Sequence, residues 1–280
     1  MSEGAELAIT TDMLVEGRHF SPGAEPRALG HKALAVNLSD LAAAGATPRW
    51  ITLALALPSA DEPWLKGFAD GLFALADRHG VELIGGDTTR GPLTIDITAF
   101  GEVPAGKALS RAGARPGDDV WVSGALGGAA LELAHPGFAG AAKRLHEPEP
   151  RVALGERLRG LASAAIDVSD GLAGDLGHIL ERSGVGAVLR YDQIPKDGSF
   201  EKIKDKKLEQ QCVLSGGDDY ELLFTAARDR RALVESVSRD LGLELSLIGE
   251  ITGQAGTLVV LDKDGNPMSH RGGYDHFRAP

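Results

Sequence analysis

Residues 85–91, Gly-Gly-Asp-Thr-Thr-Arg-Gly, limit the folding of this chain more than any other stretch. They follow a short apolar run from Val81 to Ile84 and precede an alternating run from Leu93 to Phe100, so we expect a glycine turn between two strands. The glycines would let the backbone approach a bulky anion. Asp87 would repel a bare phosphate, but the two fit together if a hard cation such as Mg²⁺ lies between them. A plain hairpin turn that carries Asp87 is the alternative.

The first strand is predicted from Leu7 to Thr11 and leads into Asp12. Asp12 offers a carboxylate, and Thr10 and Thr11 offer hydroxyl or carbonyl oxygens, which are ligand types that Mg²⁺ prefers. A cap for a helix or turn is the alternative role of Asp12. His19, in the loop that follows, is a candidate for a hydrogen bond to a substrate phosphate, and a plain polar loop residue is its alternative.

Asp40 lies inside a helix that the spacing of apolar residues predicts from Pro26 to Ala44. On the buried side its carboxylate would need a partner such as a metal, and simple solvent exposure explains the pattern equally well. A buried strand from Ile51 to Leu57 and a helix from Asp61 to about His79 come next. With the strands around residues 85–91, this β-α-β-α-β-β order favours an α/β sandwich with helices on one face of the sheet.

Residues 106–117 look like a linker, which divides the chain into a domain at 1–108 and a second domain at 109–280. Arg111 in this linker carries a guanidinium suited to polyphosphate, and an ordinary surface arginine is the alternative. The glycine turn at residues 124–128 is a weak candidate for phosphate binding at a helix N-terminus, because glycine turns are common.

A second group of carboxylates lies where a strand ends and a helix begins. Asp167 follows an apolar strand, and Asp170 comes three residues later with Ser169 between them. Ser169 or Asp170 is alternatively the N-cap of the helix. Two carboxylates so close together are usually helped by cations. A second glycine-aspartate turn at residues 215–219 leads into a further strand, whereas the lysine-rich residues 196–209 predict a solvated helix or loop.

The charge and cysteine content exclude several classes of function. The 280 residues include 29 Lys and Arg against 40 Asp and Glu, a net charge of −11, which argues against non-specific binding to nucleic acid or anionic membranes. No apolar run reaches membrane-spanning length, and the start lacks signal-peptide features. The single cysteine, Cys212, excludes an internal disulfide. We therefore expect a cytoplasmic protein.

The candidate ligands are oxygen donors without a His/Cys cluster, which indicates Mg²⁺ rather than zinc. Mg²⁺ beside glycine turns suggests nucleotide phosphate, and phosphoryl transfer needs mainly positioning and charge neutralisation by metals and arginine. In this context the sequence resembles the thiamine-monophosphate kinase family, in the superfamily that includes aminoimidazole-ribonucleotide synthetase and selenophosphate synthetase. The resemblance covers nearly the whole chain and rests on TTDMLVEGRHF, KALAVNLSDLAAAGATP, LIGGDTTRGPL, SRAGARPGDDVWVSG, IDVSDGLAGDLGHI, SGGDDYELLF and GYDHF.

The resemblance implies in-line transfer of the γ-phosphate of ATP to thiamine monophosphate, with several Mg²⁺ ions and no covalent enzyme intermediate. It implies a fold with an N-terminal α/β domain, whose mixed sheet has helices on one face and pairs with a second subunit's sheet in a homodimer, plus a C-terminal α/β sandwich. It assigns metal binding to Thr10, Thr11, Asp12, Asp40, Asp87, Asp167 and Asp170. It assigns ATP contacts to Gly86, Asp87, Arg111 and Ser169, with Asp87, Arg111 and Asp167 as the catalytic set. It assigns substrate contacts to His19, Asp218 and Tyr274, where Tyr274 would stack on a planar ring and a packed aromatic is its alternative.

Two departures from the family pattern bear on activity. Family members carry a helix and a Gly-Asp-Asp motif before the first strand, and the printed sequence begins after that point, so we expect one metal ligand fewer. Asp218 stands where the family usually has glutamate, which draws the carboxylate back by one methylene and predicts a substrate contact that is looser or mediated by water. The alternative function is therefore a weakly active or inactive member that binds nucleotide. The sequences GYDHF and SGGDDYELLF favour the thiamine branch over the other superfamily enzymes.

Overall fold

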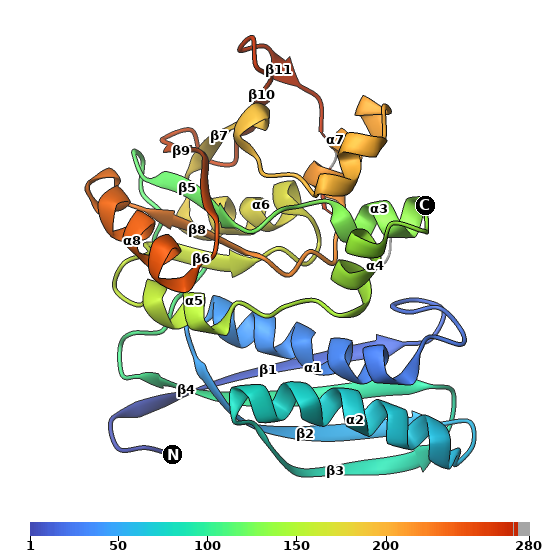
Figure 1. Ribbon diagram of the computed structural model, residues 1–280. Coiled ribbons are helices and arrows are strands. Elements are labelled where there is room, and N and C mark those ends of the chain that lie inside the picture. Colours follow the sequence, from blue (N-terminus) through green and yellow to red (C-terminus); the bar gives the residue numbers. More distant parts are fainter. Residues whose placement is uncertain (271, 274–280) are drawn as a thin grey trace.

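The structure is a computed structural model, which describes residues 1–270 and 272–273. Two β-sheets dominate it, one in each half of the chain, and Figure 1 shows the N-terminal sheet below the C-terminal one. This arrangement confirms the predicted two-part α/β fold, while the boundary at residues 108/109 stays a prediction.

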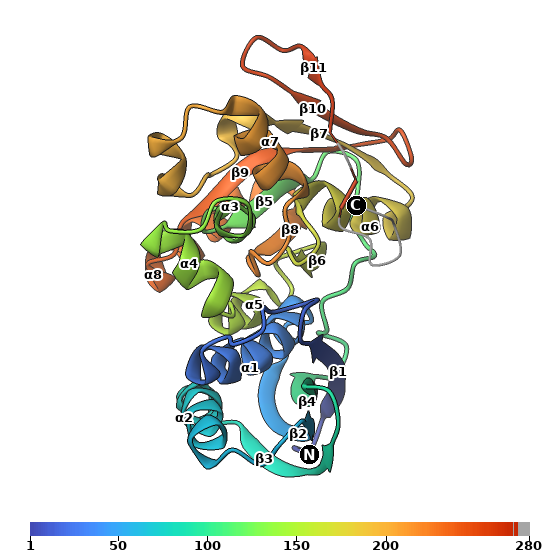
Figure 2. The same cartoon turned by 90° about the vertical axis from the view of Figure 1, so that its right-hand side faces the viewer.

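The N-terminal sheet has four strands in the order β1-β4-β2-β3, in which only β2 and β3 are parallel. Two helices, α1 and α2, lie on the same side of this sheet, as Figure 2 shows. The elements are β1 (Ala5–Val15), α1 (Pro26–Ala43), β2 (Thr47–Leu57), α2 (Glu62–His79), β3 (Glu82–Arg90) and β4 (Thr94–Pro104). The predicted helices and the predicted strand at residues 51–57 are confirmed.

Helix α1 is buried on nearly all sides because it lies between the N-terminal sheet and the C-terminal half (Figures 1 and 2). Its start is fixed by Glu25, whose carboxylate accepts hydrogen bonds from the backbone N–H groups of Arg27 and Ala28, and by Pro26 in the first turn. Its buried residues include Leu34 and Leu38, which share one apolar core with Phe224 of the C-terminal half. Polar side chains on α1 therefore lie at the junction of the two halves.

The prediction of a glycine turn at residues 85–91 is wrong for most of these residues. Residues 82–90 form β3, an edge strand, and the chain reverses only at residues 91–93. The sequence misleads because glycine and threonine replace the buried apolar residues of an ordinary strand, and all nine residues of β3 are exposed. Gly86 is required for a packing reason, since its φ is +151° and a Cβ there would lie 1.9 Å from the Leu53 carbonyl oxygen.

The C-terminal sheet has seven strands in the order β11-β10-β7-β9-β5-β8-β6. Its strands are β5 (Asp119–Ser123), β6 (Ala164–Asp167), β7 (Gly186–Arg190), β8 (Leu222–Ala226), β9 (Leu245–Thr252), β10 (Leu258–Leu261) and β11 (Pro267–Met268). Its helices are α3 (Gly128–Ala134), α4 (Ala139–His146), α5 (Val152–Leu158), α6 (Leu172–Ser183), α7 (Lys206–Ser215) and α8 (Arg231–Leu241), with short 3₁₀ turns η1 (Tyr191–Gln193), η2 (Gly198–Lys202) and η3 (Arg228–Arg230). The sequence analysis did not foresee β7, β11 or α4. Among the residues described, no helix is both long and apolar enough to cross a membrane.

Candidate active site

Four of the predicted aspartates converge where the two halves meet. Asp12 lies on β1, Asp40 lies on α1, and Asp167 ends β6 just before Asp170. The negative charges of Asp40 and Asp170 act on Asp12, and those of Asp40 and Asp12 act on Asp167. Asp12 is within a strand, so its alternative role as a helix or turn cap is wrong. The alternative of simple solvent exposure for Asp40 is also wrong, because its carboxylate is largely desolvated.

Neutral hydroxyl groups are the hydrogen-bond donors to two of these carboxylates. The Thr10 hydroxyl donates to the Asp40 carboxylate. The Ser39 hydroxyl donates to Oδ2 of Asp167 at 2.7 Å, and the Asp167 side chain is only 3% exposed. Such bonds satisfy lone pairs but do not neutralise charge, so the buried negative charges still oppose one another.

The pKa values of Asp12, Asp40 and Asp167 are all raised, as expected for buried carboxylates that repel one another. Burial, reinforced by Asp40, Asp96 and Asp170, raises the pKa of Asp12 to about 6. Burial raises the pKa of Asp40 too, although the Thr10 hydrogen bond and the Arg111 charge act in the other direction. Burial and then the charge of Asp40 raise the pKa of Asp167 well above its ordinary value. A cation at this position would relieve the repulsion.

The donor set fits Mg²⁺ by its chemistry, since it consists of hard oxygen ligands on carboxylates whose negative charges act on one another. Within residues 1–270 and 272–273, no three or more His, Cys, Asp or Glu side chains form a group that could hold a metal ion unaided. Mg²⁺ commonly takes only one or two carboxylates and completes its shell with water and substrate phosphates. The open arrangement is therefore the one that suits a cation held jointly with a nucleotide.

The turn that carries Ser169 and Asp170 is shaped by a residue that the sequence analysis missed. Oδ2 of Asp175, on α6, accepts hydrogen bonds from the backbone N–H groups of both residues, each at 3.0 Å. Burial and the nearby Asp170 raise the pKa of Asp175 to about 7. The N-cap of α6 is Gly171, so the N-cap interpretation of Ser169 and Asp170 is wrong. The signal for Asp175 was a carboxylate at helical spacing from the apolar residues Leu172 and Ile179.

Arg111 borders a hollow of about 230 Å³ beside the carboxylates, which Thr10, Asp40 and Ile166 also line. The exposed guanidinium lies on a segment that is fixed at both sides: Ser183 donates to the Arg111 carbonyl oxygen at 3.2 Å, and Ala165 donates to the Ser110 carbonyl oxygen at 2.9 Å. An anion in this hollow would meet the arginine on one side and a cation held by the carboxylates on the other.

Asp218 is held at the same junction by two side chains that the sequence analysis missed. Lys32 of α1 donates to Oδ2 of Asp218 at 3.3 Å, and the Tyr220 hydroxyl donates to Oδ1 at 3.1 Å. Asp218 and Tyr220 have φ values of 69° and 49°, a backbone region that such residues rarely adopt. Burial and the charges of Asp218, Asp12 and Asp167 raise the pKa of the Tyr220 hydroxyl well above its ordinary value, so Tyr220 faces the carboxylate group.

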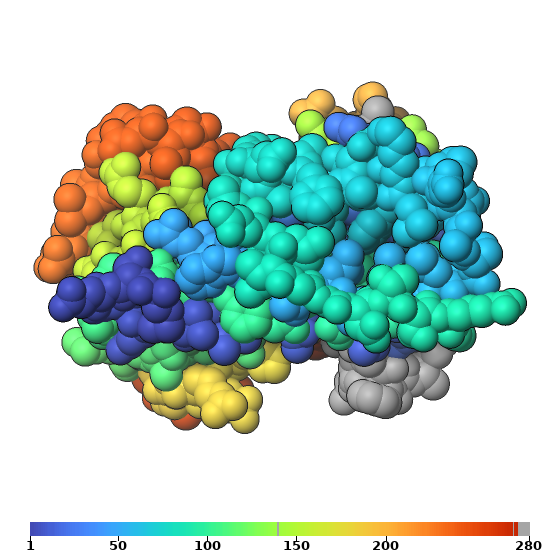
Figure 3. Space-filling view, turned by 90° about the horizontal axis from the view of Figure 1, so that it is seen from below, coloured from blue at the N-terminus to red at the C-terminus, as the bar shows by residue number. Residues whose placement is uncertain are grey.

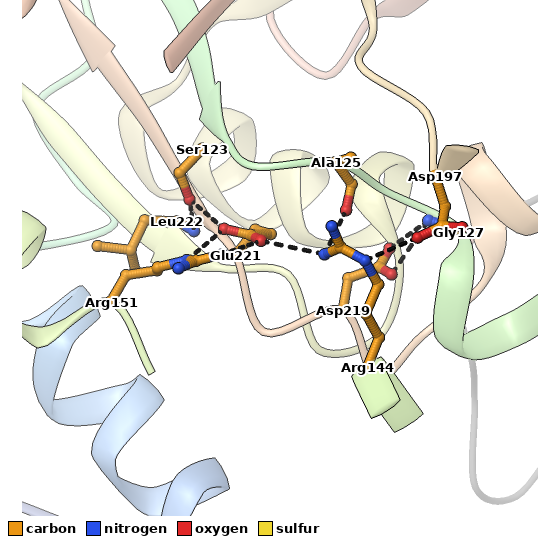
Figure 4. Close-up of polar contacts among 9 residues, drawn as sticks. All are labelled: Ser123, Ala125, Gly127, Arg144, Arg151, Asp197, Asp219, Glu221 and Leu222. Atoms are coloured by element: carbon orange, nitrogen blue, oxygen red, sulfur yellow. Dashed lines mark hydrogen bonds and ion pairs between the residues drawn. The ribbon is translucent and has the colours of Figure 1, made fainter. Parts of the chain in front are cut away.

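A separate network of paired charges lies beside this site in the C-terminal half (Figure 4). Glu221, only 1% exposed, accepts two hydrogen bonds from Arg151, at 2.7 and 2.6 Å, and one from the Ser123 hydroxyl at 2.6 Å. The Asp219 carboxylate accepts the Gly127 N–H at 3.0 and 2.8 Å. The protein's own carboxylate thus uses the glycine turn at 124–128, which disfavours the phosphate site suggested there. In the sequence, the sign that Glu221 is buried was its position directly before the apolar strand at 222–226.

Two predicted metal ligands do not join the four converging aspartates. Thr11 points to the opposite side of β1 from Asp12, and its hydroxyl bonds to Thr98 at 3.1 Å and to the Ile97 carbonyl oxygen at 3.2 Å. Asp87 lies in register with Ala54, Asp96 and Met13 across the sheet, on that same uncovered side. Since β4 and β2 separate β1 from β3, Asp87 and Asp12 lie about 14 Å apart at ordinary strand spacing, and one cation does not reach both.

Of the other two predicted substrate contacts, His19 and Tyr274, the structure describes only His19. His19 is half-buried after β1, and its Nδ1 accepts the Val15 N–H at 3.0 Å, which leaves Nε2 to carry the ring proton. Tyr274 lies outside the described residues.

The lysine-rich segment forms η2 and the start of α7, where Glu209 is buried and paired with Lys196 and Lys206 rather than wholly solvated.

The chain is similar to known proteins over nearly its whole length. Residues 1–103 match the AIR synthase related protein, N-terminal domain, and residues 115–262 match the AIR synthase related protein, C-terminal domain. The thiamine-monophosphate kinase of Salmonella typhimurium is 45% identical over 289 residues, covering 99% of this chain and 89% of the relative.

Two solved structures agree with this similarity. The crystal structure of thiamine-monophosphate kinase from Stenotrophomonas maltophilia has a TM-score of 0.89 and 46% identity, covering 95% of this chain and 87% of that one. AaThiL complexed with AMPPCP and TMP has a TM-score of 0.85 and 30% identity, covering 99% of this chain and 89% of that one.

Proposed function

Since the chain belongs to the AIR synthase related proteins, and within them to the thiamine-monophosphate kinase family, we propose that it transfers the γ-phosphate of ATP to thiamine monophosphate, giving thiamine diphosphate and ADP. The observation that carries the proposal is the convergence of Asp12, Asp40 and Asp167 beside the hollow that Arg111 borders. Buried carboxylates that repel one another next to an arginine suit a polyphosphate bound together with cations.

The chain's own residues bind and orient both substrates in this proposal. Asp12, Asp40, Asp167 and Asp170 hold Mg²⁺, which when bound neutralises charge on the ATP phosphates. Arg111 contacts the polyphosphate, and the turn that Asp175 shapes presents Ser169 to the nucleotide. His19, Asp218 and Tyr274 contact thiamine monophosphate. The acceptor phosphate oxygen is already ionised near neutral pH, so the site orients it for in-line attack without a strong general base.

Asp87 contributes to the proposed active site if two copies of the chain pair through the uncovered sides of their N-terminal sheets. Leu7, Ile9 and Met13 of β1 are 40%, 59% and 54% exposed on that side, beside a hollow of about 170 Å³ that Asp87 and Asp96 line. Seen from below, residues of the N-terminal half, blue to teal, cover most of the molecule's face (Figure 3). A homodimer would bury these apolar side chains and let Asp87 act in the site of the second copy.

The test is thiamine diphosphate formation by the chain with thiamine monophosphate, ATP and Mg²⁺, with omission of Mg²⁺ and the Asp87→Asn variant as controls. We expect metal-dependent product from the natural sequence and loss of most turnover in the variant, which keeps its fold because Asp87 is exposed. Binding of ATP without any product would instead indicate a nucleotide-binding member that lacks kinase activity. Because the reaction consumes ATP, we expect it in the cytoplasm.

The dimer is tested separately by the mass of the chain in solution. Met13→Asp places a charge in the apolar part of the uncovered side and is expected to give a monomer. Leu233→Asp is the matched control, since Leu233 is 50% exposed on α8, away from this sheet. A natural chain that is monomeric at micromolar concentration would contradict the dimer.

A further inference from the structure

Lys32 is a buried cation in a position that an apolar residue would fill. It is 4% exposed in α1, where its neighbours Ala33, Leu34 and Ala35 are all buried. Removing an ammonium from water is costly, and a methionine of similar length would fill the same space without that cost. The lysine therefore has a role other than packing.

The contacts of Lys32 show what that role is. Its ammonium reaches across the junction between the halves to Oδ2 of Asp218, while the Tyr220 hydroxyl takes Oδ1. With each oxygen bonded to a different group, the carboxylate is fixed in one orientation. Each oxygen still has a free lone pair, and the Asp218 side chain is 28% exposed, so the fixed carboxylate remains open to a ligand.

We propose that Lys32 is a positioning residue for the acceptor substrate, and that together with Tyr220 it holds Asp218 so that its carboxylate meets the cationic, amine-bearing ring system of thiamine monophosphate. This inference rests on the proposed function and adds residues to it. A carboxylate with a fixed plane loses less conformational entropy when it binds a donor than a mobile one does. The unusual backbone of Asp218 and Tyr220 fits such preorganisation, because local strain of this kind collects where geometry is required.

The experiment compares the substrate dependence of Lys32→Met with that of the natural chain. We expect the KM for thiamine monophosphate to rise by about tenfold or more, because a charge-assisted hydrogen bond is lost, while the KM for ATP stays within about twofold. Lys32→Arg retains the charge and is expected to recover part of the loss. Tyr220→Phe removes a neutral hydrogen bond and is expected to raise the same KM by about threefold.

The control is Lys66→Met, which removes a lysine that is also paired with an aspartate, Asp70, but on the exposed side of α2. It is expected to leave both KM values unchanged. A Lys32→Met protein with an unaltered KM for thiamine monophosphate, or with equal rises in both KM values, would overturn the proposal. If Lys32→Met does not fold, Lys32→Arg and Tyr220→Phe decide, and natural KM values in both would overturn it.

Failure of the proposed function is recognised independently. A natural chain that makes no thiamine diphosphate contradicts the kinase proposal, and a calorimetric titration with thiamine monophosphate then tests Lys32 without turnover. Weaker binding by Lys32→Met than by the natural chain would support the positioning role. Equal binding, or no binding by either protein, would overturn it.

Discussion

Two groups of carboxylates lie close together in this molecule and differ in how their charge is balanced. The Glu221 carboxylate accepts two hydrogen bonds from the guanidinium of Arg151 and forms an ion pair with Arg144 at 3.4 Å (Figure 4). Asp167 is also buried, and among residues 1–270 and 272–273 its carboxylate accepts a side-chain hydrogen bond only from the hydroxyl of Ser39, while the charges of Asp40 and Asp12 oppose its own. The Glu221 carboxylate is balanced by arginines of the chain itself. The opposed aspartates keep a mutual repulsion that a bound cation would relieve.

This difference separates a structural role from a functional one. A buried carboxylate with its own arginines stabilises the native state only as a pair, and the loss of either partner leaves an uncompensated charge. Buried carboxylates that oppose one another destabilise the native state and are expected where a cation binds. The role of a cluster of aspartate and glutamate residues is therefore inferred from the charged groups that contact each carboxylate and not from the composition of the motif.

The largest expected effect is on activity, and it comes from Asp167→Asn. The amide keeps the size of the side chain and its bond to Ser39, but it removes the charge of a proposed metal ligand, so we expect turnover to fall by about 10²-fold or more. The stability of the free protein should stay the same or rise, because the variant relieves repulsion with Asp40. Steady-state kinetics and thermal unfolding measure both, and a marked loss of stability would contradict the account.

The paired network is expected to respond in the opposite way. Glu221→Gln leaves Arg151 without its carboxylate and should cost about 3 kcal/mol of unfolding free energy, as is typical for breaking a buried ion pair. Denaturant unfolding at pH 7.5 gives this value. An unchanged midpoint would show that the network contributes nothing that a neutral amide does not supply.

The pH dependence of stability sharpens the comparison. The pKa values of Asp12 and Asp175 rise from 3.8 to about 6 and about 7 on folding. Between these limits the folded chain holds protons that the unfolded chain has released, so the free energy of unfolding falls as pH rises from about 4 to 7. The lowered pKa values of Asp197 and Glu209 act oppositely below about pH 4.5. Burial also lowers the pKa of His79 from 6.5, which opposes the trend below about pH 6.5 through one group against the two aspartates.

Without Mg²⁺, the melting temperature should therefore be at least about 3 °C higher at pH 5.5 than at pH 8. Mg²⁺ with ATP should reduce this difference, because the cations favour the ionised carboxylates. Calorimetric scans in the two buffers, with and without Mg²⁺ and ATP, make the measurement. A melting temperature that rises with pH across this range would contradict the assigned repulsion.

The smallest expected effect comes from an exposed ion pair. Arg157 and Asp240 are 46% and 49% exposed and lie 2.7 Å apart. Arg157→Met should cost no more than about 1 kcal/mol, because solvent screens such a pair. A loss as large as that of Glu221→Gln would show that burial does not explain the strength of the network.

The sequence predicted the elements that have a regular apolar pattern. The helices predicted at 26–44 and 61–79 and the strand predicted at 51–57 were found because their apolar residues repeat at helical spacing or form a continuous run. Asp167 was found for the same reason, since a carboxylate inside an apolar run is conspicuous, whereas the spacing alone left Asp40 open between a buried position and solvent exposure. The resemblance to the kinase family, which the comparisons confirm, supplied the assignment of roles.

The features that were missed depend on contacts between distant parts of the chain. Residues 82–90 have no buried face of their own, and hydrogen bonds to β2 make them a strand. A lysine in a helix is ordinarily exposed, and only the packing of α1 beneath the C-terminal half brings Lys32 to Asp218, 186 positions away. The placement of Asp12 and Asp87 on opposite sides of one sheet likewise follows from the register of strand pairing, which local patterns do not specify.

Calorimetric titration of Mg²⁺ in the presence of ATP tests the central claim most directly, that the opposed carboxylates form a cation and nucleotide site. The proteins are the natural chain, Asp167→Asn and, as the matched control, Glu221→Gln at a temperature where it remains folded. We predict saturable Mg²⁺ binding by the natural chain, retained in Glu221→Gln and weakened by about tenfold or more in Asp167→Asn. Equal Mg²⁺ affinity in the natural chain and Asp167→Asn would contradict the account.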